Sequence, residues 1–277
     1  MSWAVVARKD FEDAARSKML WAITALFVLT TAGGMYAAGV VLDQQRASEA
    51  LQWLGAPAAM IVPLAALVVA YLAIAGERES GSIKILLGLP HTRRDVVLGK
   101  LLGRATVVAV ATVVAFLAGA VVLLVQHGSL PVVEFALLGL NTLFFGLVFV
   151  GIAVGFSAMM ATRSRAMAGA IGLFFIFQLI WDFVPLGVYY VVEGGMPTVM
   201  QGLPAWYFFV QMINPKNAYS TLSTHLVNPN TATQIEQMLG GDIPFYLQEW
   251  FLVVILLAWL VVPVALGYWR FQRVDLG

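Results

Sequence analysis

Six long apolar stretches constrain this chain more than any other feature of its sequence. Each reaches or exceeds the roughly 20 residues that a helix needs to cross about 30 Å of hydrocarbon. Charged residues make up only 11% of the chain, whereas about a quarter of a soluble domain is charged. The sequence therefore predicts an all-α membrane protein, with one domain over residues 1–277 and six transmembrane helices. The predicted spans are residues 19–41, 56–76, 105–126, 131–160, 166–192 and 250–269.

The positions of lysine and arginine predict the orientation of the spans. Of the 16 basic residues, all but Arg46 and Lys216 fall in the N-terminal segment, in the loops after the second and fourth spans, or in the C-terminal tail. Cytoplasmic segments carry an excess of Lys and Arg. We therefore expect a multi-pass protein of the cell membrane with both termini in the cytoplasm. The charged loop 77–104 lies on that side, and the segment 193–249 forms the outer loop.

The N-terminal segment, residues 1–18, has the pattern of an amphipathic helix. Trp3, Ala7, Phe11, Ala14 and Lys18 recur at steps of three and four, and most of the charged residues fall away from this stripe. Such a helix lies in the inner membrane interface; the alternative is a cytoplasmic extension of the first span.

The outer loop is rich in helix breakers and in aromatic residues that favour the headgroup region. We expect part of it to be re-entrant, with a short helix over residues 231–239.

The loop 77–104 is the most distinctive segment of the chain. Its acidic and basic residues Glu77, Arg78 and Glu79 follow the second span directly, so opposite charges can pair where the helix leaves the membrane. The segment Ser82–Leu89 is mostly apolar and lies between Gly81 and Pro90. It is too short to span a membrane. It therefore needs a protein or an interface to pack against.

A new helix is predicted directly after this segment. Thr92 and Asp95 have the spacing of a capping box, in which each side chain binds the backbone amide of the other residue. The helix then continues through Val96, Val97 and Leu98 into the third span. The loop is thus predicted to form a short docking helix, a proline turn and a capped helix.

The pattern E-R-E-x-G-S…L-L…P-x-T-R…G-K resembles the cytoplasmic loop of permease subunits in the ABC-2 family of ABC transporters. Many members carry Thr where this chain has Ser82 and Ser where it has Thr92, so both differences keep a hydroxyl group. The overall architecture is similar along the whole chain. Asn214-Pro215 in the outer loop is also similar to a pair common in the nitrous-oxide-reductase maturation exporter group.

The resemblance implies that a coupling helix near Ser82–Leu89 inserts into a cleft of a separate ATP-binding subunit. Apolar residues of this helix would anchor it, and charged residues around it would orient it. The alternative is an interfacial loop whose basic residues only follow the positive-inside rule. The candidate coupling residues are Glu77, Arg78, Glu79, Gly81, Ser82, Ile83, Ile85, Leu86, Leu87, Pro90, Arg93, Arg94, Gly99 and Lys100.

The sequence contains no phosphate-binding loop of the form G-x-x-x-x-G-K-[ST]. The chain is therefore not expected to be an enzyme or to carry a cofactor, and ATP and Mg²⁺ would bind a separate ABC ATPase subunit. The resemblance implies a second permease copy, identical or paralogous, with the pathway of an exporter between the two bundles. Membrane lipid is an expected partner and nucleic acid is not. Small-residue faces at Ala111/Ala115/Gly119, Gly151/Gly155 and Ala168/Gly172 suit helix packing.

Glu134 and Asp182 are the ionisable residues within the predicted spans, and such residues are candidates for a transport pathway. The alternative is that both reach the outer headgroups without a specific role. The chain has no cysteine and no cluster of His, Asp and Glu suited to a metal. An ion-coupled secondary transporter is the main alternative function, although such proteins usually place charged or unwound segments at the midplane. Lipids, drugs, polysaccharide, sodium and copper- or sulfur-linked molecules remain open as cargo.

Overall fold

The computed structural model describes residues 3–16, 18–41, 47–52, 54–197, 203–228 and 243–274. All the regular secondary structure in this part of the chain is helical, and six of its helical stretches are long and apolar enough to cross a membrane. The predicted all-α fold with six candidate spans is thus confirmed. The helices are α1 (Trp3–Ala15), α2 (Lys18–Val41), α3 (Ala47–Gln52), α4 (Gly55–Ala70), α5 (Ala75–Ser80), α6 (Ser82–Gly88), α7 (Arg93–His127), α8 (Val132–Met159), α9 (Arg163–Phe175), α10 (Val184–Glu193), α11 (Ala205–Met212), α12 (Pro215–Val227) and α14 (Glu249–Gln272).

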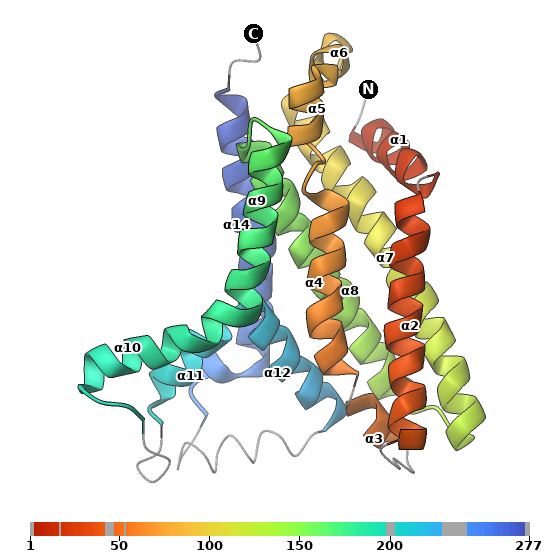
Figure 1. Ribbon diagram of the computed structural model, residues 1–277, viewed down its shortest axis with the longest axis vertical. Coiled ribbons are helices and arrows are strands. Elements are labelled where there is room, and N and C mark those ends of the chain that lie inside the picture. The colour runs from red at the N-terminus through yellow and green to blue at the C-terminus, as the bar shows by residue number, and fades with distance from the viewer. Residues whose placement is uncertain are drawn as a thin grey trace.

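The long helices run side by side along the long axis of the molecule, and α8 forms the centre of the bundle (Figure 1). It packs against α14, α4, α7 and α12. Aromatic rings fill this core: Phe145 of α8 stacks on Tyr219 of α12 with ring centroids 4.1 Å apart. Buried apolar area is the main source of stability in such a core. Helix α8 therefore fixes the positions of the surrounding spans.

The second predicted span, residues 56–76, is interrupted near its C-terminal end. Helix α4 ends at Ala70, and α5 begins at Ala75 after a short turn. The hydroxyl oxygen of Ser157 in α8 accepts hydrogen bonds from the backbone amides of Ile74 and Ala75, each at 3.0 Å. Amides at the start of a helix otherwise have no intrahelical partner. Ser157 thereby stabilises the start of α5.

The fifth predicted span, residues 166–192, is helical throughout but is not one regular α-helix. Helix α9 begins earlier, at Arg163, and is followed by a π-helical turn at Ile176–Ile180 and a 3-10 turn at Trp181–Phe183. Helix α10 then leaves the bundle at an angle (Figure 1). A π turn leaves a backbone carbonyl free for another partner, and here the amide of the fully buried Asn214 donates to the carbonyl of Phe177 at 2.8 Å.

In the described part of the segment 193–249, α11 and α12 lie at the end of the bundle opposite α6 (Figure 1), and a 3-10 turn at Phe245–Leu247 precedes α14. Helix α11 precedes Asn214, whose side chain caps α12 by accepting from the amide of Lys216 at 2.8 Å. Helix α12 then packs into the bundle against α8, α14 and α4. The helix predicted over residues 231–239 lies outside the described residues.

Candidate functional site

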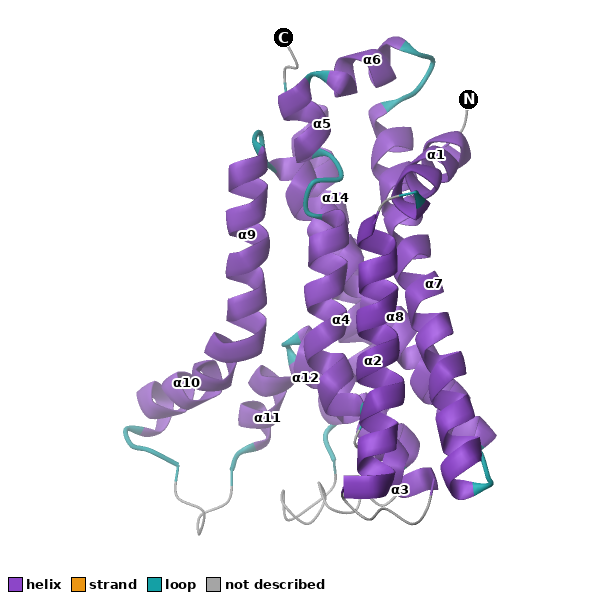
Figure 2. Ribbon diagram, turned by 45° about the vertical axis from the view of Figure 1, so that its right-hand side comes forward, coloured by secondary structure: helices purple, strands orange, loops and turns teal. Residues whose placement is uncertain are grey.

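The candidate coupling residues gather at one end of the bundle, where α1, α5, α6, the start of α7 and the C-terminal end of α14 lie together (Figure 2). The predicted capping box at the start of α7 is confirmed. The Thr92 hydroxyl oxygen accepts from the amide of Asp95 at 3.1 Å, and the Asp95 carboxylate accepts from the amide of Thr92 at 3.0 Å. This box gives α7 a defined start directly after the docking segment.

Helix α6 has one side packed on its own chain and one side exposed. Ile83 is 1% exposed and belongs to the hydrophobic core, and Leu86 and Leu87 are half-buried against the same core. Ile85 is 75% exposed and Leu89 is 52% exposed. The predicted apolar anchors therefore have different surroundings. Ile83 packs α6 onto the bundle, whereas Ile85 is the one predicted anchor whose side chain is mostly exposed.

One glycine, Gly81, precedes α6, and one proline, Pro90, follows it. Gly81 has a φ of +75° and serves both as the C-cap of α5 and as the N-cap of α6. This left-handed conformation is strained for residues with a Cβ atom. Pro90 is exposed after the last turn of α6, and the Ser82 hydroxyl lies 3.0 Å from that of Ser80. These residues set the angle at which α6 leaves the bundle.

Four charged side chains, two of them buried and two partly buried, link α1 to α5 and the first turns of α7, which together support α6. The Lys100 ammonium lies 2.7 Å from Asp10 Oδ1 in α1 and 2.5 Å from Glu77 Oε1 in α5. Arg104, one turn further along α7, places Nε 2.8 Å from Asp10 Oδ2. Asp10 is 3% exposed and Lys100 is 7% exposed. Buried charges are tolerated when they are paired in this way, so these four residues form one charged network, the Asp10 network.

Glycines of α7 allow α1 to approach closely enough for this network to form. A Cβ atom on Gly99 would lie 2.5 Å from the Cβ of Val6, and one on Gly103 would lie 2.8 Å from the Cβ of Asp10. Val6, Asp10 and Ala14 form the buried stripe of α1. Both residues of the G-K motif at 99–100 therefore contact α1 of the same chain. Gly99 allows the close approach of α1, and Lys100 pairs with its Asp10.

Arg78 and Glu79 hold the connection between α8 and α9. The guanidinium of Arg78 donates to the carbonyls of Met160, at 2.6 Å, and Ala158, at 3.4 Å. The carboxylate of Glu79 accepts a hydrogen bond from the backbone amide of Arg163 at the start of α9. Residues of the E-R-E triplet thus connect α5, which precedes α6, to the end of α8 and to the start of α9.

The adjacent arginines at the start of α7 have different surroundings. The guanidinium of Arg93 donates to the backbone carbonyls of Phe271, Gln272 and Val274 at the C-terminal end of α14, where a cation is favoured. Arg94 is exposed. No hydrogen bond or ion pair joins its side chain to the part of the chain that the structure describes.

Three residues with a clear part in this arrangement are absent from the sequence-based set: Asp10, Arg104 and Ser157. Asp10 could have been found, because it is an acidic residue on the apolar side of the N-terminal helix. Arg104 repeats the Gly-Lys pair four residues later as Gly103-Arg104. Ser157 lies in an apolar helix with no local signal for its role. Most of the motif supports α6, and α6 itself presents the exposed surface.

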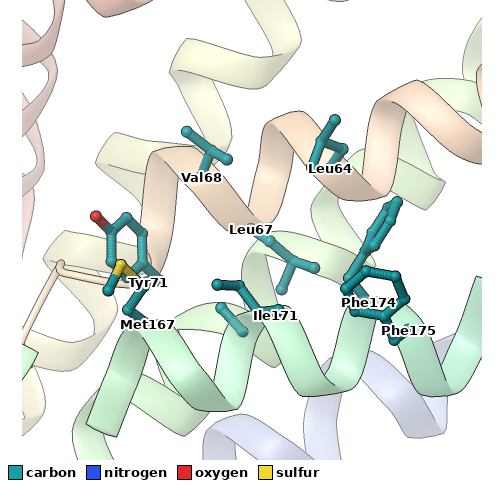
Figure 3. Close-up of a pocket in the computed structure, with 9 residues that line it drawn as sticks. Leu64, Leu67, Val68, Tyr71, Met167, Ile171, Phe174 and Phe175 are labelled. Atoms are coloured by element: carbon teal, nitrogen blue, oxygen red, sulfur yellow. The ribbon is translucent and has the colours of Figure 1, made fainter. Parts of the chain in front are cut away.

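The candidate pathway residues lie elsewhere. Asp182 is exposed at the bend between α9 and α10, with its Oδ1 3.5 Å from the ammonium of Lys216. Glu134 is half-buried in the first turn of α8, at the end of the bundle opposite α6. Neither residue belongs to the apolar groove between α4 and α9. That groove has a volume of about 450 Å³ and is lined by residues such as Leu67, Ile171 and Phe174 (Figure 3).

Comparison with known proteins agrees with this architecture. The model of the ABC-2 family of transporter proteins matches residues 4–276. A relative from Pseudomonas aeruginosa, described as a probable ABC transporter permease protein NosY, is 31% identical over 279 residues. One from Stutzerimonas stutzeri with the same description is 30% identical over 275 residues. Each alignment covers 97% of both chains. The chain therefore belongs to the ABC-2 family and is a multi-pass permease subunit of an ABC transporter.

Proposed function

We propose that this permease forms half of the membrane part of an exporter, and that a separate ATPase drives it by docking on α6. The observation that carries the proposal is the two-sided packing of α6. Its Ile83 side is held by the bundle, while Ile85 and Leu89 are more than half exposed at the end of the molecule (Figure 2). Exposed apolar residues at a projecting tip favour insertion into a partner's cleft.

The same end is proposed to be cytoplasmic. Arg93, Arg94 and the basic residues of α1 lie there, as do Arg270 in the last turn of α14 and Arg273 directly after it. This distribution follows the positive-inside rule. Both α1 and the C-terminal end of α14 lie at this end, as expected for an even number of spans. Helix α1 would lie along the inner membrane surface, with Arg8 and Lys9 exposed and Val6 packed on α7.

The contacts of the motif explain how movement of α6 would reach the spans. Glu77 connects α5 to Lys100 in α7, and Arg78 connects α5 to the end of α8. A force on α6 therefore acts on the second, third and fourth spans together, because all three are attached to its support. ATP and Mg²⁺ would act on the partner ATPase, as the family membership of this permease implies such a partner.

A second permease copy is proposed to pack against α9. Only 11% of the apolar part of the stretch Arg163–Glu193 is buried, compared with 67% for α8. The small-residue faces of α7 and α8 are already used, since Cβ atoms on Gly119 and Gly155 would clash with α2 and α14. A Cβ atom on Gly172 of α9 would meet no atom within 4 Å. The Ala168/Gly172 face is therefore free to receive another helix.

With this arrangement, the groove between α4 and α9 opens beside the interface of the two bundles (Figure 3). Its lining is apolar apart from the hydroxyl of Tyr71, and a concave apolar surface favours cargo with an apolar part. Export of such a molecule would proceed between the two copies.

Docking of the ATPase is tested by Ile85→Asp. A candidate ABC ATPase partner is co-expressed with tagged permease, and its recovery with the permease from detergent is measured. We expect the recovered ATPase to fall at least tenfold, because a charge would have to be buried in an apolar cleft. The permease should keep its own fold, since Ile85 is 75% exposed.

Two controls accompany this experiment. Ser164→Asp adds the same charge at an exposed position of the same end, at the start of α9, where an acidic residue is favoured; it should leave ATPase recovery unchanged. Ile83→Asp places the charge in the permease core and should lower the yield of folded permease. Normal ATPase recovery with Ile85→Asp would show that α6 is not the docking element.

The interface at α9 is tested with single cysteines, because the chain has none of its own. Gly172→Cys is expected to give a disulfide-linked dimer when membranes are oxidised. Leu117→Cys, on a 64% exposed position of α7, should remain monomeric. Dimer formation only through Leu117→Cys would place the second copy on the opposite part of the bundle.

A further inference from the structure

A second apolar groove, distinct from the one beside α9, runs between α7 and α14. Its volume is about 400 Å³. Leu147 of α8 closes it from the inside, while α7 and α14 form its two walls. Its lining includes Arg94, Leu98 and Leu102 of α7 and Leu260, Val264 and Ala265 of α14.

The groove follows the axes of its two helices. Arg94, Leu98 and Leu102 succeed one another at intervals of four along α7 and therefore lie along one side of that helix. Leu260, Val264 and Tyr268 do the same on α14. Eight residues of helix correspond to about 12 Å. The groove is thus an elongated apolar depression in the surface of the bundle, about as long as two turns of helix.

Arg94 is the one charged residue in the lining and occupies the end of the groove nearest α6. Its neighbours are already engaged: Arg93 binds carbonyls at the end of α14, and Asp95 binds the amide and hydroxyl of Thr92. The Arg94 side chain itself is exposed and has no hydrogen-bond or ion-pair partner among the described residues. A guanidinium in this position is suited to a phosphate group.

We propose that this groove binds an anionic phospholipid of the inner leaflet, with its phosphate at Arg94 and one acyl chain between α7 and α14. Basic pockets between transmembrane helices on the cytoplasmic side recognise anionic lipid head groups. One unpaired cation at the end of an apolar groove matches the anionic head group and the apolar tail of such a lipid. The proposal depends on the cytoplasmic orientation of this end and on no contact with the ATPase.

The test uses the purified permease without ATPase, titrated with phosphatidylglycerol or phosphatidylcholine and observed by native mass spectrometry. The unaltered chain should bind the first phosphatidylglycerol more tightly than phosphatidylcholine. Arg94→Ala should weaken that binding about fivefold, the factor that corresponds to about 1 kcal/mol per basic residue at a membrane surface. Phosphatidylcholine binding should change little, and Arg94→Lys should keep most of the preference.

Two further variants separate the groove from general surface charge. Arg165→Ala removes an exposed arginine at the same end but on α9, and it should leave the phosphatidylglycerol affinity unchanged. Ala265→Phe fills the groove without altering charge, and it should weaken binding of both lipids. Equal losses with Arg94→Ala and Arg165→Ala would overturn the proposal, as would unchanged binding with Ala265→Phe. An ATPase that fails to dock on α6 would leave these results unaffected, so the two proposals fail separately.

Discussion

At the scale of single residues, the charged motif acts mainly within the permease. Lys100 contacts both Asp10 and Glu77, and Arg104 contacts Asp10 from the next turn of α7. These groups lie where α1, α5 and α7 meet, so pairing them fixes three helices relative to one another. By contrast, the pair Arg8–Glu12 on α1 is exposed, with side chains 83% and 47% accessible. Only the first group is placed to affect the geometry of the end that carries α6.

Asp10→Ala is predicted to destabilise the permease by about 3 kcal/mol, because it removes the buried carboxylate that pairs with Arg104 and leaves the buried Lys100 with Glu77 as its one remaining ionic partner among the described residues. Thermal unfolding of the purified permease in detergent measures this effect. Glu12→Ala is the matched control on the same helix, and it should have little effect because exposed ion pairs contribute little. Equal, small effects of the two substitutions would contradict the structural role of the Asp10 network.

At the scale of helices, close backbone contact decides which faces are internal. Gly155 of α8 and Gly267 of α14 face one another, and a Cβ atom on Gly155 would lie 2.3 Å from the carbonyl oxygen of Pro263. That contact is with backbone, so the two helices would have to separate to accommodate it. By contrast, a Cβ atom added to Gly172 of α9 would meet no atom within 4 Å. The two glycines have similar sequence surroundings but opposite environments.

Gly155→Ala is therefore predicted to destabilise the permease by about 1–3 kcal/mol, the usual range for an overpacked core. Gly172→Ala should leave the unfolding midpoint of the isolated permease unchanged or slightly raised, because alanine favours helix. Thermal unfolding of both variants in detergent distinguishes them. A larger loss with Gly172→Ala than with Gly155→Ala would contradict the helix packing described above.

Local sequence signals were sufficient for some elements and insufficient for others. The apolar stretches predicted the six spans, and Thr92 with Asp95 predicted the start of α7, because both signals depend on neighbouring residues. The break after Phe175 depends on Asn214, nearly 40 positions further along the chain, and on a carbonyl of Phe177. The outward direction of Ile85 depends on how α6 rests on the core through Ile83. Such long-range contacts leave no pattern in the nearby sequence.

At the scale of the whole molecule, the permease presents two contrasting ends. One end carries most of the basic residues, α6 and the network that supports it. The opposite end carries α10, α11 and the bend after α9 (Figure 1). The helices between them are attached to the support of α6 through Arg78, Lys100 and Arg93. A partner that moves α6 would therefore move the bundle as a whole, which is the action expected of an ATPase on an ABC transporter permease.

The most direct measurement of this central claim is a cross-link from α6 to the ATPase. A cysteine replacing Ile85 is labelled with a photoactivatable reagent, and the labelled permease is mixed with its ATPase and illuminated. The absence of native cysteine makes the label specific. We predict a covalent permease–ATPase product with Ile85→Cys, and none with Ser164→Cys at the start of α9. A product with Ser164→Cys alone would contradict docking on α6.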